Sequence, residues 1–346
     1  MVAHGALDYA ELARLGIAPA DVCDFSSNIN PFGPPEAVRR ALSQLDPAPY
    51  PDRACIALRQ RLADSHGCAP EHILVGNGCN ELIYLTSRAM LRPGDRALVV
   101  GATYGEYARA SELCGAQVCH VGAAGDFALG DAAIGAAVRE LRPRLTWVCT
   151  PNNPTGARFS PDAAERIAMA CADAGGLLVL DRSYAALERP ADVVDIDIKN
   201  GALALFSLTK SYALAGLRLG YMCGDAVLLA QIAAFQPTWS VSSAAQAAGL
   251  AALDDRAFLP RTLPLIWAES DALAAELGSF GLTVWRDRLP MLLVRVGDAA
   301  AVRTRLLSQG MLVRDCASFG LPEWVRVAPR LPEENRRLIA AWRSTL

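Results

Sequence analysis

Short apolar runs alternate with segments of helical spacing through the middle of the chain. The runs are HILVGNG, RALVVG, LTWVCT, GLLVLD, ALALFSLTK and RLGYMCG, and the helical segments lie around residues 80–90, 104–114 and 161–174. Apolar runs of this length are typical of strands buried on both faces. Their alternation with helices predicts a mainly parallel sheet wrapped by helices.

The pattern changes after a helical stretch from about residue 242 to residue 277. Short strands, LTVW, MLLVRV, MLVRD and WVRVA, then surround one helix, and the chain closes on another. This mixture is typical of a smaller α+β unit. We therefore expect an α/β protein with a large domain at residues 46–250 and a smaller domain formed by residues 1–45 and 251–346.

The composition is that of a soluble globular protein, with 52% hydrophobic and 20% charged residues and a formal net charge of -3. The arginines are scattered rather than gathered in a basic stripe, which argues against nucleic acid as a partner. The longest apolar runs are far shorter than the roughly 20 residues that cross a bilayer, so no membrane association is expected. The start, MVAHGALDYAELARLG, lacks the features of a signal peptide, and we expect a cytoplasmic protein.

Neither the cysteines nor the histidines are spaced as metal ligands. The ten cysteines are dispersed without a CxxC pair, as expected of small buried apolar side chains. The four histidines, His4, His66, His72 and His120, show no ligand spacing either. The sequence therefore predicts no metal centre.

Lysine is rare in this chain. Of the 33 basic residues only Lys199 and Lys210 are lysines, and arginine fills every other basic position. Arginine cannot replace lysine where a primary amine must lose its proton and add to a carbonyl carbon to form a Schiff base. Since Lys210 directly follows a predicted strand, in the segment SLTKSYALAGLR, we interpret it as a reactive amine.

Four motifs follow predicted strands, at the edge of the sheet where ligands gather in open α/β folds. GNGCNE opens a helix, so the backbone N–H groups near Gly78, Cys79 and Asn80 are placed to bind a phosphate, although an Asn-Gly turn before a helix is also an ordinary turn. TPNNPTG contains two turns. These turns either direct an amide side chain into the cleft or have only a structural role, as turns of the backbone.

The other two motifs supply charged groups. LVLDRSY places Asp181 at the end of an apolar strand, with Tyr184 three residues later. A carboxylate there needs a cation, either a structural arginine or a protonated ligand nitrogen. SLTKSYALAGLRLGY brings Ser207, Lys210 and Arg218 to the end of another strand. The four motifs together indicate phosphate donors, a partner for a pyridinium nitrogen and a Schiff-base amine.

The order of these motifs resembles that of the fold type I pyridoxal-phosphate enzymes, close to the histidinol-phosphate aminotransferases of the class I and II aminotransferase superfamily. The matching elements are GNG, PNNPTG, D-x-x-Y, S-x-x-K and an arginine eight residues after the lysine, and they span nearly the whole chain. The resemblance implies a large domain that binds pyridoxal 5'-phosphate and a small domain that covers the substrate.

The resemblance also implies roles for single residues. Lys210 would form the Schiff base with the cofactor, and Asp181 would pair with its pyridine nitrogen. The other implied contacts are Tyr184 and Asn153 at the ring oxygen, Tyr104 stacked on the ring, and Ser207, Arg218 and the amides of Gly78, Cys79 and Asn80 at the phosphate.

Two further features follow from the same resemblance. Tyr50, in the segment YPD, is similar to the residue that such enzymes extend to the cofactor of the partner subunit, which implies a homodimer. Many relatives carry D-E-A-Y or D-E-A-F where this chain has Asp181, Arg182, Ser183 and Tyr184. This departure keeps the aspartate and the tyrosine, and it puts in doubt only the local packing and hydrogen bonding.

Three arginines near the C-terminus are candidates for binding an anionic substrate. Arg314, Arg326 and Arg330 lie in or near VRDCASFGLPEWVRVAPR. The planar guanidinium group suits carboxylates and phosphates, so a substrate with two anionic ends is a natural inference. A solvated surface position fits Arg330 better than it fits the other two.

Two N-terminal segments and one segment that begins at Gln236 narrow the family further. HGALDYAELARLGI, DFSSNINPFGPP and QPTWSVSSAAQAAG resemble stretches of the L-threonine-O-3-phosphate decarboxylases, whereas histidinol-phosphate aminotransferases tend to begin with N-E-N-P. By this similarity His4, Asn30 and Arg314 would bind the substrate phosphate, and Arg326 would bind the α-carboxylate. His4 could also be a residue of a mobile terminus.

The implied activity is the decarboxylation of L-threonine O-3-phosphate to (R)-1-amino-2-propanol O-2-phosphate in cobalamin biosynthesis. The alternative is a histidinol-phosphate aminotransferase, or a related enzyme for another phosphorylated or aromatic amine. Ligand-sensing domains of transcription regulators share this fold, but they need a basic DNA-binding module ahead of it, and only about 45 residues precede the YPD segment.

Overall fold

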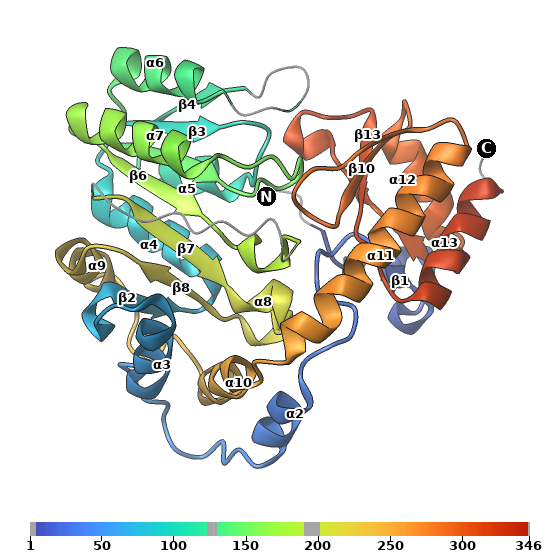
Figure 1. Cartoon of the computed structure of the whole chain (residues 1–346), viewed down its shortest axis with the longest axis horizontal. Coiled ribbons are helices and arrows are strands. Elements are labelled where there is room, and N and C mark those ends of the chain that lie inside the picture. Colours follow the sequence, from blue (N-terminus) through green and yellow to red (C-terminus); the bar gives the residue numbers. More distant parts are fainter. Residues whose placement is uncertain (1–4, 123–126, 128–129, 190–200, 345–346) are drawn as a thin grey trace.

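The computed structural model describes residues 5–122, 127, 130–189 and 201–344. It contains a larger part built on a seven-stranded sheet and a smaller part built on a four-stranded sheet (Figure 1). The chain is therefore an α/β protein with two sheet-centred parts. The limits of the two predicted domains, at residues 45/46 and 250/251, stay a prediction.

The large sheet is mainly parallel, as predicted. Its strands are β2 (Ile73–Gly76), β3 (Arg96–Val100), β4 (Gln117–Val121), β5 (Leu145–Cys149), β6 (Leu177–Asp181), β7 (Leu203–Ser207) and β8 (Gly220–Cys223). Their order across the sheet is β2-β8-β7-β6-β5-β3-β4. Only β8 pairs antiparallel, with β2 on one side and β7 on the other. The predicted apolar runs are six of these strands, and the edge strand β4 is the seventh.

The central strands are apolar on both faces because both faces are covered. On β6, Val179 packs into one hydrophobic cluster while Leu178 and Leu180 pack into another. On β5, Trp147 and Val148 divide between the two clusters in the same way. Period-two alternation of side chains therefore produces a continuous apolar run wherever helices pack on both sides of a sheet.

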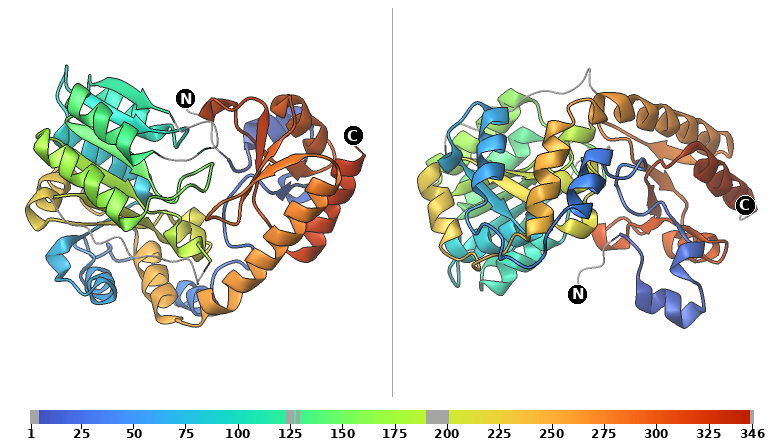
Figure 2. Two further views of the ribbon diagram at one scale, coloured as in Figure 1. Left: turned by 45° about the horizontal axis from the view of Figure 1, so that its top comes forward. Right: turned by 90° about the horizontal axis from the view of Figure 1, so that it is seen from below.

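Eight helices accompany this sheet in the described residues (Figure 2). The helices are α3 (Ile56–His66), α4 (Gly78–Met90), α5 (Glu106–Leu113), α6 (Asp131–Leu141), α7 (Pro161–Asp173), α8 (Leu208–Ser211), α9 (Ala226–Ala233) and α10 (Ser243–Asp254). Side chains of α4, α5 and α9 fill one cluster, and those of α6 and α7 fill the cluster on the opposite face. The helices predicted near residues 80–90, 104–114 and 161–174 are α4, α5 and α7.

The smaller part follows the long helix α11 (Phe258–Ser279), which leads away from the large sheet (Figure 1). The other elements are β9 (Thr283–Trp285), β10 (Leu292–Arg295), α12 (Ala299–Leu307), β11 (Met311–Leu312), β12 (Arg314–Asp315), β13 (Trp324–Val327) and α13 (Pro332–Arg343). The sheet order is β12-β13-β10-β9. The helical stretch predicted at residues 242–277 comprises two helices, α10 and α11.

The N-terminal segment lies against both parts. It contains α1 (Tyr9–Leu15), β1 (Cys23–Asp24) and α2 (Glu36–Ser43). β1 pairs in parallel with β11 of the smaller part, whereas α2 packs on α10. The chain between β1 and α2 therefore crosses from one part to the other, and it passes the carboxyl ends of the large sheet on the way (Figure 2).

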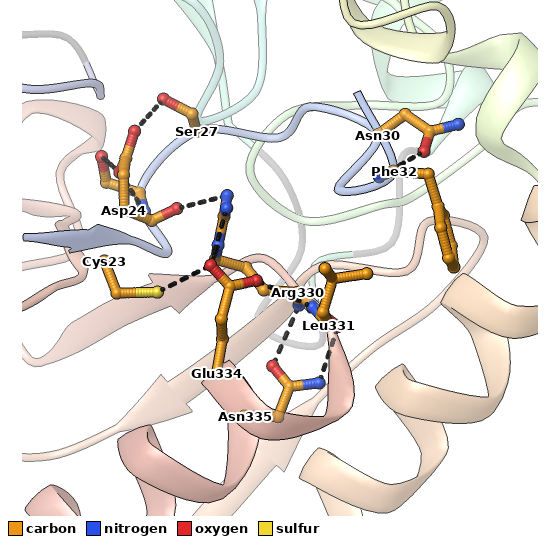
Figure 3. A network of polar contacts seen from close by, with 10 residues as sticks. Cys23, Asp24, Ser27, Asn30, Phe32, Arg330, Leu331, Glu334 and Asn335 are labelled. Atoms are coloured by element: carbon orange, nitrogen blue, oxygen red, sulfur yellow. Dashed lines mark hydrogen bonds and ion pairs between the residues drawn. The ribbon is translucent and has the colours of Figure 1, made fainter. Parts of the chain in front are cut away.

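Arg330 fastens β1 to the start of α13 (Figure 3). Its Nε donates to Glu334 Oε1 at 2.9 Å, and its Nη1 donates to the carbonyl oxygen of Asp24 at 3.3 Å. The thiol of Cys23 donates to the same Glu334 oxygen at 3.3 Å, and burial raises the pKa of that thiol to about 12. Arg330 is more exposed than Arg314 and Arg326, in line with the comparison made from the sequence, but its guanidinium group is not free in solvent, because it joins two segments of the smaller part.

Among the described helices, none combines the length and the apolar character needed to span a lipid bilayer.

Candidate functional site

A cleft of about 560 Å³ lies where the carboxyl ends of β5, β6 and β7 meet the beginning of α4. Its walls come from all four predicted motifs. The lining residues are Cys79, Asn80, Tyr104, Tyr107, Cys149, Asn153, Asp181, Ser183, Tyr184, Ser207, Thr209, Lys210 and Arg218. The structure therefore brings together residues that are up to 139 positions apart, because the strands that carry them lie side by side in the sheet.

Lys210 reaches this cleft from α8, the short helix that directly follows β7. Ser207 caps this helix by accepting from the backbone N–H of Thr209 at 3.3 Å. Burial, followed by the charges of Arg326 and Arg218, lowers the pKa of the Lys210 amine to about 8. This shift favours the neutral amine, which is the form that a nucleophilic lysine requires.

Asp181 ends β6 and lies at the floor of the cleft, where it is 4% exposed. Its Oδ2 accepts from the Tyr107 phenol at 2.6 Å, and its Oδ1 accepts from the backbone N–H of Ser183 at 2.8 Å. Burial raises the pKa of this carboxyl group, and the hydrogen bonds from Ser183 and Tyr107 oppose that shift. A cation in the cleft would stabilise the ionised carboxylate.

Residues 182 and 183, where this chain departs from the pattern of many relatives, make contacts beside this carboxylate. The Ser183 hydroxyl donates to Cys79 Sγ at 3.2 Å, so it joins the β6 motif to the beginning of α4. Arg182 is buried near Glu188, a fully buried carboxylate that also pairs with Arg158 at 2.7 Å. The arginine therefore has a buried acidic neighbour, which offsets the cost of placing its charge inside the protein.

A concave group of donors lies at the start of α4. Gly78 has a left-handed φ of +78°, and a Cβ atom there would lie 2.8 Å from Nη2 of Arg218. At Gly220 a Cβ atom would lie 2.7 Å from the backbone nitrogen of Cys79. Both positions therefore need glycine to keep the guanidinium group and the first amides of α4 close together. Ser207 and Thr209 add hydroxyl groups, whose oxygens lie 2.5 Å apart.

Tyr104, Asn153 and Tyr184 surround the middle of the cleft. Arg326 donates to Asn153 Oδ1, and because arginine has only donors, this bond leaves the Nδ2 group of Asn153 as a donor for another partner. The Tyr104 phenol lies 3.4 Å from Asn80 Oδ1, and its ring meets Tyr107 edge to face. This arrangement can hold a flat ring between Tyr104 and the opposite wall.

Arg314 and Arg326 occupy paired positions on adjacent strands of the smaller sheet. They are 8% and 4% exposed. Arg326 binds two neutral acceptors, Asn153 Oδ1 and the Ser26 carbonyl oxygen, and Arg314 donates to Ser318 Oγ at 2.6 Å. Two buried positive charges thus lie together, with Arg326 next to the cleft.

Residues of the N-terminal segment take different positions. The backbone N–H of Asn30 donates to the Lys210 carbonyl oxygen at 2.9 Å, but its side-chain amide is engaged by Ser211 O and Thr262 Oγ1 at 3.0 Å each. Asn30 therefore supports the lysine loop, and phosphate binding would require it to exchange these bonds. His4 lies outside the described residues.

Gly5 packs directly on the arginine site. A Cβ atom at Gly5 would lie 2.5 Å from the Ser26 carbonyl oxygen and 3.3 Å from Nη2 of Arg326. The next residue, Ala6, donates its backbone N–H to Ser26 Oγ at 2.8 Å. The segment that begins with the His-Gly motif therefore runs beside Arg326.

Tyr50 is not part of the cleft within this chain. It is 79% exposed, and its ring stacks on Trp239 with the centroids 4.5 Å apart. Trp239 is itself 46% exposed and has a left-handed backbone, with φ of +60°. The two rings form an exposed aromatic pair on the outside of the larger part.

Sequence reasoning missed four residues of the cleft: Tyr107, Cys149, Ser183 and Thr209. Ser183 and Thr209 lie inside recognised motifs and Cys149 directly precedes one, so proximity to a motif is the signal that the sequence offers for these three. Tyr107 lies far from the four motifs and has no such signal. Cys149 belongs to the ten cysteines, all of which are described and are free thiols. In the described part of the chain, no cluster of histidine, cysteine and acidic side chains is arranged to hold a metal ion.

Comparison with known proteins identifies the family. The family model of aminotransferase class I and II matches residues 20–341. The chain belongs to this family. Membership confirms the predicted family, the fold type I architecture and the dependence on pyridoxal phosphate.

Two curated relatives of this chain have different names. Histidinol-phosphate aminotransferase 1 of Thiobacillus denitrificans is 36% identical over 96% of this chain and 88% of its own. The threonine-phosphate decarboxylase of Salmonella typhimurium is 35% identical over 99% of this chain and 96% of its own. Sequence similarity to these two proteins is therefore nearly equal.

Solved structures show the same architecture. The histidinol-phosphate aminotransferase of Sinorhizobium meliloti, in complex with pyridoxal-5'-phosphate, superposes with a TM-score of 0.90 at 23% identity and covers 99% of this chain and 96% of that one. The L-threonine-O-3-phosphate decarboxylase of Porphyromonas gingivalis gives a TM-score of 0.80 at 26% identity, with 93% and 98% covered.

Proposed function

We propose that the cleft holds pyridoxal phosphate between Lys210 and Asp181. The buried carboxylate suits a protonated ring nitrogen, because this cation would offset the loss of water around Asp181. The amine, with its pKa lowered to about 8, is suited to attack an aldehyde carbon. The glycine positions beside Arg218 leave room for a phosphate at the start of α4.

The remaining cofactor contacts would come from side chains that line the same cleft. We infer that Tyr184 and the Nδ2 group of Asn153 donate to the ring oxygen and that Tyr104 stacks on the ring. The phosphate would accept from Arg218, from the hydroxyls of Ser207 and Thr209, and from the amides of Gly78, Cys79 and Asn80.

We propose that the substrate is L-threonine O-3-phosphate and that the reaction is its decarboxylation. The observation that carries this proposal is the packing of Gly5, from the N-terminal segment that resembles the decarboxylases, on Arg326, which forms a buried pair with Arg314. The substrate has a carboxylate and a phosphate separated by only two carbon atoms, and two guanidinium groups at paired positions suit two anions at that spacing. Arg326, beside Asn153, would bind the carboxylate, and Arg314 would bind the phosphate.

The N-terminal segment supports the same substrate. Gly5 and Ala6 pack on Ser26, whose carbonyl oxygen accepts from Arg326. This contact links the His-Gly start, which resembles that of the decarboxylases, to the arginine that would bind the carboxylate. A contribution of His4 to phosphate binding remains part of the proposal.

The chain's own groups would then perform the reaction. Pyridoxal phosphate, when bound, supplies the sink for the electron pair that the departing carbon dioxide leaves at Cα. Arg326, which is 4% exposed, would orient the carboxylate. The ammonium form of Lys210 donates the proton that replaces the carboxylate at Cα. The products are carbon dioxide and (R)-1-amino-2-propanol O-2-phosphate, an intermediate of cobalamin biosynthesis.

Histidinol-phosphate aminotransferase activity is the second candidate. Several relatives at 31% to 36% identity carry that name. Its amino donor has one anionic group, but glutamate and 2-oxoglutarate each have two carboxylates, which the arginine pair would also suit. The arginines alone therefore do not separate the two activities, and the products must be measured.

The decisive experiment uses the holoenzyme with each substrate separately. With L-threonine O-3-phosphate and no keto acid, we expect stoichiometric release of carbon dioxide and of aminopropanol phosphate, detected by mass spectrometry. With histidinol phosphate and 2-oxoglutarate, we expect glutamate formation at least about 100 times slower in kcat/KM. Formation of glutamate without carbon dioxide release from the first substrate would establish the aminotransferase instead.

We also propose that the enzyme works as a homodimer in which Tyr50 reaches the partner subunit's cofactor. The support is the position of Tyr50, exposed and stacked on Trp239 rather than turned into the cleft of its own chain. An aromatic pair of this kind on the surface is suited to burial against a second copy.

A further inference from the structure

Tyr107 contacts the carboxylate that would pair with the cofactor. Its phenol donates to Asp181 Oδ2 at 2.6 Å, and the tyrosine is 1% exposed. Both residues line the cleft. A hydrogen bond of this length to a buried carboxylate is charge-assisted, and such bonds are about twice as strong as neutral ones.

The tyrosine ring is held in place independently of the aspartate. It stacks on Trp147 with an interplanar angle of 10° and a centroid separation of 5.2 Å. The Trp147 indole donates to Ser111 Oγ at 3.3 Å, and the Ser111 hydroxyl donates to the Tyr107 carbonyl oxygen at 2.8 Å. Burial, and then the Asp181 charge, raises the pKa of the Tyr107 phenol well above its ordinary value. The phenol therefore stays a donor throughout the working pH range.

The two oxygens of Asp181 thus have different fixed partners. Oδ1 accepts from the backbone of Ser183 at 2.8 Å, and Oδ2 accepts from Tyr107. An ionised carboxylate has about four acceptor sites, so these bonds leave it able to accept from a cation as well. With both oxygens fixed, the plane of the carboxylate is set before any cation arrives.

We propose that Tyr107 is a positioning residue that fixes the Asp181 carboxylate for the ring nitrogen of the cofactor. This inference rests on the proposed binding of pyridoxal phosphate, but it does not depend on which reaction follows. Tyr107 would act only through Asp181, and it would contribute to cofactor affinity and to the protonation of the ring nitrogen.

The test is Tyr107→Phe, which keeps the ring and its stacking on Trp147. We expect the Kd of the apo-protein for pyridoxal phosphate to rise about tenfold, the size expected when a buried hydrogen bond to a charged group is lost. With 15N-labelled cofactor, the ring nitrogen resonance should shift from its wild-type position toward that of neutral pyridine. Tyr221→Phe is the matched control, because it removes another buried phenol, bonded to His66 at 2.9 Å, and should leave both readouts unchanged.

A double-mutant cycle separates positioning from general packing. In an Asp181→Ala background, Tyr107→Phe should change the Kd by less than about twofold, since the acceptor is gone. A tenfold effect in that background would show that the phenol acts elsewhere and would overturn the inference, as would an unchanged Kd and nitrogen resonance in the single variant.

A second variant keeps the inference testable if Tyr107→Phe does not fold. Ser111→Ala removes the acceptor of the Trp147 indole and loosens the tyrosine, so we expect an approximately threefold rise in Kd with the same direction of nitrogen shift. No shift would contradict the inference. If carbon dioxide release fails while these affinity effects hold, the proposed substrate is wrong and the role of Tyr107 stands.

Discussion

Arg314 and Arg326 lie directly opposite one another on the antiparallel strands β12 and β13. Paired residues on neighbouring strands point to the same face of a sheet, so the two buried side chains share one environment. Burial, followed by the charge of Arg326, lowers the pKa of Arg314. Like charges at this spacing destabilise the ligand-free protein, and an anion bound to both would relieve the repulsion.

Replacing one member of this pair tests its role in substrate binding. We expect Arg326→Gln to lower kcat/KM for L-threonine O-3-phosphate about 100-fold or more, because the substrate carboxylate would lose its charged partner. Arg295→Gln is the control, since Arg295 lies on β10 of the same sheet but is exposed and paired with Glu323. Steady-state kinetics of both variants check this expectation, and equal losses in the two would contradict it.

Gly78→Ala tests the proposed phosphate site. The added methyl group would meet Arg218 at 2.8 Å, and the left-handed backbone at φ +78° would be strained. We expect the Kd for pyridoxal phosphate to rise about tenfold or more, with a loss of roughly 1 kcal/mol in the free energy of unfolding.

Gly175→Ala is the matched control for backbone strain. Its φ is +76°, but no atom lies within 4 Å of the added methyl group. This variant should lose similar stability and keep the wild-type Kd, as measured by titration of the apo-protein. A normal Kd in Gly78→Ala would argue against phosphate binding at the start of α4.

The lowered pKa of Lys210 predicts a pH-dependent stability of the apo-protein. The amine titrates at about 8 in the folded protein and near its ordinary value of 10.5 in the unfolded chain. Between pH 8 and pH 10.5 the unfolded chain therefore binds more protons than the folded protein does. Lys210 destabilises the folded protein most below pH 8, and this destabilisation decreases as the pH rises to 10.5.

Lys210→Met removes this titration. We expect the variant to be more stable than wild type by about 3 kcal/mol at pH 7, and the difference should shrink as the pH rises above 8. Urea unfolding of both apo-proteins at several pH values measures it. A constant difference across this range would mean that the folded protein does not lower the pKa of Lys210.

Mixed subunits test whether Tyr50 acts across the dimer. Tyr50→Ala and Lys210→Ala should each be inactive as homodimers. If Tyr50 serves the partner subunit, one site of each mixed dimer is intact, and random mixing should restore about a quarter of the wild-type activity. If Tyr50 serves its own chain, mixing should restore none. Activity after joint refolding of the two variants distinguishes these outcomes.

The strands of the sheet were predictable where burial is complete. β5 and β6 are apolar at almost every position because helices cover both faces, and such runs stand out in a sequence. β4 gave no such run, since Gln117 and His120 are exposed at the edge of the sheet. Edge strands carry polar residues that a search for apolar runs overlooks.

The site was predictable as far as its residues follow strands. Asp181 and Lys210 end up in one cleft because β6 and β7 are neighbours, which the alternation of strands and helices implies. Tyr107 could not be assigned in this way. It lies inside a helix, and its bond to Asp181 joins residues 74 positions apart, a contact that only the packing of α5 on the sheet creates.

The positions of the arginines could likewise be predicted only in part from the sequence. Arg326 and Arg330 are four residues apart and chemically identical, yet one lies beside the cleft and the other pairs with Glu334. The end of β13 at Val327 separates them, and an exposed or a buried position could not be read from the residue type. The predicted cytoplasmic location stays a prediction.

Borohydride reduction of the holoenzyme tests the central claim most directly. Reduction converts a Schiff base into a stable secondary amine, so peptide mass spectrometry can locate the pyridoxyl group. We predict a single modified lysine at Lys210 in the wild-type protein and no modification in Lys210→Ala. A pyridoxyl group on Lys199, or on no lysine at all in a protein that still turns over its substrate, would contradict the assignment of Lys210.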